Sequence, residues 1–174
     1  MVRFLLALIL SLKISALSVN SAYNPFEPDI IKVTNTFVTD VNTAAQTQFN
    51  NFNITPVVNT DTNSDVFTSV TSNGVECAIG TYLVDVVLYQ SDNVARSNVA
   101  VEITVDGIST GIRAANSYIR NSSGHNEAST NAYDMVRLTS PGKIGFDTLQ
   151  LAGTGNVNAP ANQSSMRIVR IDDI

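Results

Sequence analysis

Charged side chains are scarce in this sequence of 174 residues. They make up 14% of the chain, against about 25% in an average soluble protein, and the net charge is −5. The few Lys and Arg residues are scattered, so no basic cluster is present that could follow a phosphate backbone. We therefore expect no nucleic-acid partner.

Cysteine is limited to a single residue, Cys77, which lies in the apolar run VECAIG. One cysteine cannot form a disulfide within its own chain, so the fold does not need an oxidising compartment. The run predicts a buried thiol that packs as a small hydrophobic side chain. An interchain disulfide or a reactive thiol is the alternative.

The residue types that usually carry catalysis form no recognisable pattern. His125 is the only histidine, and one histidine cannot supply the two or three ligands of a histidine metal site. The segment DTNSD, from Asp61 to Asp65, resembles the start of a calcium loop. However, Val66 and Ser72 stand where such a loop carries Gly and Glu, so we expect a polar turn. We expect no enzyme activity, no metal and no cofactor.

An apolar run opens the chain. Arg3 precedes the run from Phe4 to Leu10, and the small residues of Ala16–Ser18 have the spacing of a cleavage site. Two interpretations follow: a retained helical arm that a neighbouring subunit covers, which we favour, or a secretory signal peptide removed near Val19. Lys13 leaves the run too short for a transmembrane helix, so we expect no membrane span. The side chains expected to contact an assembly partner are Phe4, Leu5, Leu6, Leu8, Ile9 and Leu12.

The remainder of the chain is rich in uncharged polar residues, with 19 asparagines, and reads as short strands separated by turns. Two prolines mark residues 19–29 as a linker, so we expect an arm and linker over residues 1–29 and one domain over residues 30–174. The segment TYLVDVVLY is apolar enough for a strand buried on both faces. We expect an all-β sandwich or jelly roll with strands over residues 31–41, 48–58, 65–70, 81–89, 97–105, 108–115, 133–138, 144–151 and 166–171.

Four segments resemble strands of the C1q/TNF jelly-roll family, in the family's order. They are GTYLVDVVLY, VEITVDG, YDMVRLTSPGKIGFDTLQL and SSMRIVRI. The resemblance implies a compact homotrimer with aromatic and aliphatic side chains packed on the threefold axis. By position, and because alternate strand residues share one face, Tyr82, Val84 and Val86 are the candidates for that axis. Ordinary core between the two sheets is the alternative for these three residues.

Modules that resemble this family also occur in bacteriophage virions as capsid decoration (cement) proteins, head fibres and tail-fibre tips. Our leading hypothesis is a structural virion protein on the capsid surface, whose partners are its own copies and the major capsid protein or other virion subunits. The alternative is a receptor- or glycan-binding fibre tip, or a secreted C1q-like binding protein with a cleaved signal peptide. Candidate recognition residues lie in two polar loops: Asn121, His125, Asn156 and Asn158.

Three sequons for N-linked glycosylation occur, at Asn53, Asn121 and Asn162. They have a meaning only if the chain passes through a eukaryotic secretory route. In a chain this rich in Asn, Ser and Thr, three matches also arise by chance.

Overall fold

The computed structural model describes residues 28–37, 39–41, 45–92, 97–115, 119, 126–153 and 157–172. All regular elements within these residues are β-strands, and they form two antiparallel sheets. In the same residues there is no helix long and apolar enough to cross a membrane. The expectation of an all-β sandwich is confirmed.

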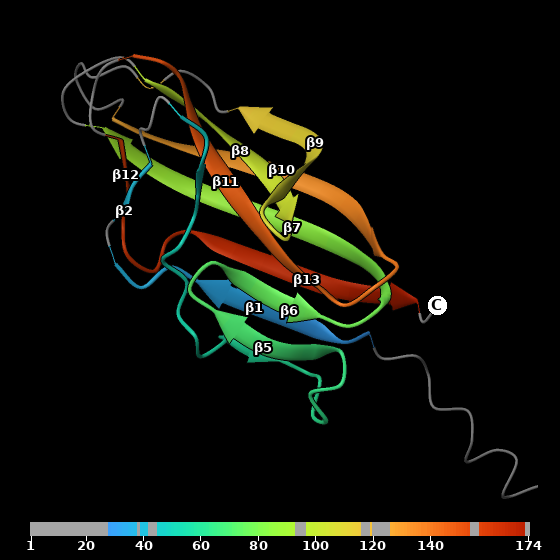
Figure 1. Cartoon of the computed structure of the whole chain (residues 1–174). Helices are drawn as coiled ribbons and strands as arrows, with labels where there is room; N and C mark the ends of the chain where they lie inside the picture. The colour runs from blue at the N-terminus through green and yellow to red at the C-terminus, as the bar shows by residue number, and fades with distance from the viewer. Residues whose placement is uncertain are drawn as a thin grey trace, which may run out of the picture.

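The first sheet contains the long central strand of the protein, β7 (Gly80–Asp92). On one side β7 pairs with β10 (Glu127–Leu138), and on the other side with β12 (Val157–Ala159) and β13 (Ser165–Asp172). The sheet continues from β13 to β1 (Ile30–Thr34) and β4 (Val58–Asn59), and from β12 to β2 (Thr39–Asp40). Figure 1 shows the longer strands of this sheet, β10, β7, β13 and β1, running side by side.

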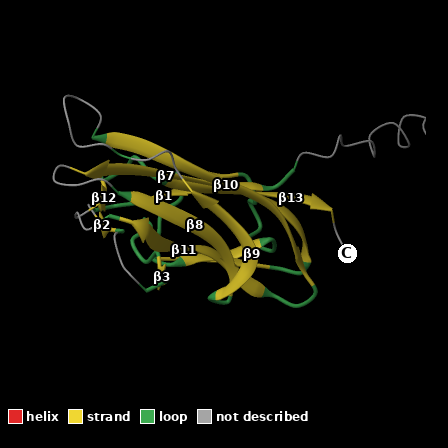
Figure 2. Cartoon of the chain, turned by 90° about the horizontal axis from the view of Figure 1, so that it is seen from above, coloured by secondary structure: helices red, strands yellow, loops and turns green. Residues whose placement is uncertain are grey.

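The second sheet is built around β11 (Gly142–Ala152), which pairs with β8 (Asn98–Val105). Its remaining strands are β3 (Thr47–Gln48), β5 (Phe67–Thr71), β6 (Gly74–Cys77) and β9 (Ile108–Ala115). Figure 2 shows β7, β10 and β13 in one layer and β8, β9 and β11 in the other. The inward side chains of both layers form one core, as in sandwiches generally.

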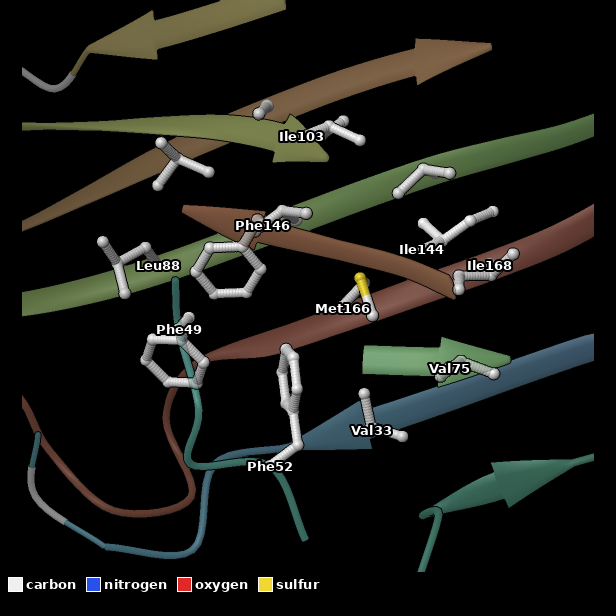
Figure 3. Close-up of a cluster of buried hydrophobic side chains, with 14 of the residues drawn as sticks. Val33, Phe49, Phe52, Val75, Leu88, Ile103, Ile144, Phe146, Met166 and Ile168 are labelled. Carbon is white, nitrogen blue, oxygen red and sulfur yellow. The ribbon is translucent and has the colours of Figure 1, made fainter. Parts of the chain in front are cut away.

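Three phenylalanines occupy the middle of this core (Figure 3). The rings of Phe49 and Phe146 stack with their centroids 4.6 Å apart, and Phe52 meets Phe146 edge-on at 5.5 Å. Such aromatic pairs add about 0.5–1.5 kcal/mol each beyond the burial of their area. Phe49 and Phe52 therefore fix the segment after β3 against the sheet even though most of that segment is not a strand.

Backbone conformation at one turn and a close contact at another explain why glycine stands at particular positions. Asp106 and Gly107 have positive φ angles of 52° and 76° and close the predicted hairpin between β8 and β9. At Gly145, an added Cβ would lie 2.5 Å from the carbonyl oxygen of Asn73. Gly145 thus allows the β5–β6 turn to pack against β11.

The structure corrects the strand boundaries in three main places. The strand expected over residues 31–41 is divided into the separate strands β1 and β2. The strand expected over residues 48–58 is mostly irregular, because Phe49 and Phe52 turn into the core and only its ends pair in β3 and β4. The polar stretch before Tyr133 was expected to be a loop, yet β10 begins at Glu127, where pairing with β7 overrides the local sequence.

Candidate association surface

The three residues predicted for a threefold axis lie in the core. Tyr82, Val84 and Val86 are each 0% exposed within a single chain and face the second sheet from β7. The Tyr82 hydroxyl donates a hydrogen bond of 2.8 Å to the carbonyl of Ala78. The burial therefore supports the alternative interpretation of these residues, because they offer no surface to another copy.

The predicted recognition residues are covered only in part by the structure. Asn158 lies in β12, is half-buried and pairs with Asp40 and Ser91 on the two neighbouring strands. The other predicted residues lie outside the described part of the chain, and their roles stay predictions: Asn121, His125 and Asn156 in the loops, and Phe4, Leu5, Leu6, Leu8, Ile9 and Leu12 in the arm.

The solvent-facing side of the first sheet carries a row of apolar side chains. Pairing places Met135 of β10 beside Leu83 of β7, then Val169 of β13, and then Ile30 of β1. Met135 is 61% exposed, and the other three are half-buried. We call this face, with the neighbouring Tyr133, the association surface. A contiguous apolar row on the outside of a soluble domain is typical of an interaction site.

A polar row lies directly beside the apolar one. Pairing aligns Tyr133 of β10, Asp85 of β7, Arg167 of β13 and Lys32 of β1. Tyr133 is 60% exposed, and the Arg167 guanidinium lies 3.2 Å from the Asp85 carboxylate. An exposed ion pair of this kind contributes little to stability, about 0–1 kcal/mol. Fixed charges next to an apolar row do set how a second surface can align with it.

Two buried carboxylates, Glu102 and Asp147, lie opposite each other on β8 and β11 of the other sheet. Glu102 accepts hydrogen bonds from Ser109 Oγ and from Arg113, whose Nη2 lies at 2.8 Å. The Ser109 bond lowers the pKa of Glu102; burial opposes this, and Arg113 adds to the lowering. The Glu102 carboxylate is thus bonded by side chains of the neighbouring strand β9, which indicates a structural role.

Asp147 differs from Glu102 in that only one of its oxygens is bonded. Its Oδ2 accepts a hydrogen bond of 2.9 Å from Gln46, and its buried Oδ1 has no partner within the described residues. Burial raises the pKa of Asp147, and the negative charge of Glu102 raises it further. In the described part of the chain, no three His, Cys, Asp or Glu side chains converge as metal ligands.

The DTNSD segment forms a turn that is held by its first residue. Asp61 Oδ2 accepts backbone hydrogen bonds from Val66 at 3.0 Å and from Phe67 at 2.8 Å. Burial raises the pKa of Asp61, but these backbone donors outweigh it and leave the pKa below its ordinary value. The carboxylate thus closes the turn before β5.

Cys77 is the last residue of β6, and its side chain is buried in the core, as its apolar surroundings predicted. Burial raises the pKa of its thiol, and the neighbouring Glu76 charge adds to that shift. A thiol that stays protonated is a poor nucleophile. The structure therefore supports a packing role for Cys77.

Asn35 is a buried polar residue whose structural role sequence reasoning missed. It is 0% exposed, and its Oδ1 accepts hydrogen bonds from the backbone N–H groups of Gln163 and Ser164. Its Nδ2 donates to the carbonyls of Phe37 and Pro160 at 3.1 and 2.7 Å. Asn35 therefore fixes the turn between β12 and β13. No sequence signal separates it from the other asparagines, because all of its side-chain partners except Phe37 lie more than a hundred residues away.

Comparison with solved structures identifies the fold, whereas comparison of the sequence with families and curated proteins gives no match. Among solved structures, the chain is similar to the Eiger TNF of S. frugiperda, with a TM-score of 0.59 and 14% identity over 85% of this chain and 96% of that one.

It is also similar to murine APRIL, with a TM-score of 0.53 and 13% identity over 83% of this chain and 100% of that one. The globular domain of the zebrafish complement 1qA protein follows, with a TM-score of 0.50 and 12% identity over 85% of this chain and 100% of that one. At these identities the likeness concerns the fold alone. The protein has the C1q/TNF-like jelly-roll fold that its strand segments predicted.

Proposed function

We propose that this protein is a non-catalytic extracellular binding domain that works as a homotrimer, assembled through the association surface. The single observation that carries the proposal is the row Met135, Leu83, Val169 and Ile30 on the open side of the first sheet. A second copy that covered this row would remove apolar area from water at about 25 cal/mol per Å².

The composition of β7 supports this assignment. The strand is apolar enough for burial on both faces, yet within one chain only its inward residues are fully buried. Its outward residues Leu83, Val87 and Tyr89 are half-buried. Residues of this kind on a central strand are explained when a further layer covers the sheet, and another copy of the chain supplies that layer in our proposal.

The extracellular location rests on the fold comparison and on the opening sequence. The three similar structures named above are a TNF, APRIL and a complement domain. They favour the second of the roles expected from the sequence, in which residues 1–18 are a secretory signal. The role as a capsid decoration or head-fibre subunit stays a prediction that would require the same self-association and a retained arm.

The trimer proposal is tested with one pair of charge substitutions. Met135→Lys places a cation at the β10 end of the apolar row, at its most exposed member, whereas Leu151→Lys places one at an exposed apolar position on β11 in the other sheet. Light scattering after size exclusion should report monomers for Met135→Lys and trimers for Leu151→Lys. Equal stoichiometry in both variants would contradict the assignment of this face.

A further inference from the structure

Two of the three sequons lie within the described residues, and the fold brings them to one end of the sandwich. The backbone N–H of Asn53 donates to the carbonyl of Thr34 at 2.8 Å, and that of Asn162 donates to the carbonyl of Asn35 at 2.9 Å. Thr34 and Asn35 are consecutive residues at the end of β1. The fold therefore brings Asn53 and Asn162, which are 109 positions apart in the sequence, to the same end of β1.

The local geometry at Asn53 suits a carbohydrate. Asn53 is half-buried and stands in an irregular turn, and its Oδ1 accepts a hydrogen bond of 3.0 Å from the N–H of Thr55. Glycosylation substitutes the amide nitrogen, so this bond to the oxygen is retained. Ile54 and Thr55 are exposed, which leaves the surroundings of the sequon open to solvent.

Asn162 occupies the exposed turn between β12 and β13. Its φ of 61° lies in the left-handed region, which Asn tolerates better than most residues. Ser164, the hydroxyl residue of this sequon, is fully buried, and its Oγ accepts a hydrogen bond from the N–H of Tyr89 at 3.1 Å. Transfer at Asn162 must therefore precede closure of this turn, as it does when sugar is attached during synthesis.

We propose that Asn53 and Asn162 carry N-linked glycans, which rests on the secretory route of the proposed function. The donor is a lipid-linked oligosaccharide diphosphate. The amide Nδ2 forms a bond to the anomeric carbon, the lipid diphosphate leaves and an amide proton is released, with no change of oxidation state. The two glycans flank the exposed apolar side chains Phe37 and Ile54.

The sites are compatible with assembly because they lie away from the apolar row. Ile30, the β1 member of that row, is five residues from Asn35, which corresponds to about 16 Å along an extended strand. Carbohydrate at this end therefore leaves the row open to another copy. It shields one end of each subunit instead.

The test is expression of the full-length chain in eukaryotic cells, followed by peptide N-glycosidase and mass spectrometry of the medium and the cells. All versions carry Asn121→Gln, so that the third sequon adds no carbohydrate. Thr55→Ala removes the first sequon, and Thr55→Ser keeps it. Asn162→Gly removes the second while it suits the positive φ, and Gln163→Ala keeps it.

We expect two glycosidase-sensitive steps in the secreted protein, one of which disappears in Thr55→Ala and the other in Asn162→Gly. Both steps should persist in Thr55→Ser and Gln163→Ala. A secreted, trimeric chain without carbohydrate would overturn this inference and leave the proposed function standing. A chain that stays in the cytosol without carbohydrate would overturn the extracellular location and this inference together.

Discussion

Removal of the Asn35 side chain is the sharpest test of what holds the sandwich together. In Asn35→Ala, the N–H groups of Gln163 and Ser164 lose their side-chain acceptor, and the carbonyls of Ala159 and Pro160 lose the amide donor. The Phe37 carbonyl keeps the hydrogen bond from Asn51. The turn between β12 and β13 then keeps only the two backbone hydrogen bonds that residue 35 makes with Asn162 and Ser164, while the sheet pairing between β1 and β13 remains.

The cost follows from how many of these groups water can reach. Two of the five hydrogen bonds are buried, those to Ser164 N and Ala159 O, and the other three are partly buried. A buried polar group left without a partner costs about 1–3 kcal/mol. Two such groups give about 4 kcal/mol, a large share of the roughly 5–15 kcal/mol that stabilises a typical domain.

Urea denaturation followed by circular dichroism measures this loss as a shift of the midpoint at unchanged slope. The matched control is Asn51→Ala, which removes an exposed side-chain amide that donates to the same Phe37 carbonyl at 2.8 Å. We expect Asn51→Ala to cost less than about 1 kcal/mol, because water replaces an exposed hydrogen bond. Similar costs for the two variants would refute the role of Asn35 as a buried hub.

Three further predictions concern the second sheet. The pKa of Asp147 is raised in the folded state, so its contribution to stability is present at low pH and lost as the pH rises through the folded pKa. Asp147→Asn should therefore raise the urea midpoint at neutral pH and change it little in acid. The pKa of Glu102 is lowered, so its contribution to stability is present at neutral pH and lost as the pH falls through the folded pKa. Glu102→Gln should cost about 1–3 kcal/mol at neutral pH and less in acid, measured by urea denaturation at both pH values. Gly145→Ala places a Cβ against the backbone oxygen of Asn73 and should cost about 1–3 kcal/mol by thermal melting. Gly142→Ala meets side-chain atoms of Asp106 and Val105 rather than backbone, and should cost less.

Local patterns were sufficient to predict the fold class and most of the strands. Alternating apolar residues located β8 and β9, and Asp106 with Gly107 located the turn between them, because hairpin register depends on neighbours in the chain. The short strands β6 and β12 were missed, because their four and three residues are too few to show a period. Their pairing comes from the long strands beside them.

The association surface was harder to predict, because the sequence of a strand does not show which of its two faces packs against the core. By position and resemblance, Tyr82, Val84 and Val86 on one face of β7 were candidates for a threefold axis, with ordinary core as the alternative. Those residues pack inward, and the alternate set with Leu83 faces solvent. When both faces of a strand are apolar, a period of two cannot say which face is inward. Only the packing of the second sheet decides it.

Native mass spectrometry of the natively produced protein tests the central claim, assembly of three copies through the association surface, most directly. Under native conditions we predict the mass of three copies, and after denaturation the mass of one chain that begins near Val19. A monomer across the accessible concentration range would contradict assembly through the association surface. A trimer of full-length chains would keep the assembly but contradict removal of the leader, and would return the virion role to first place.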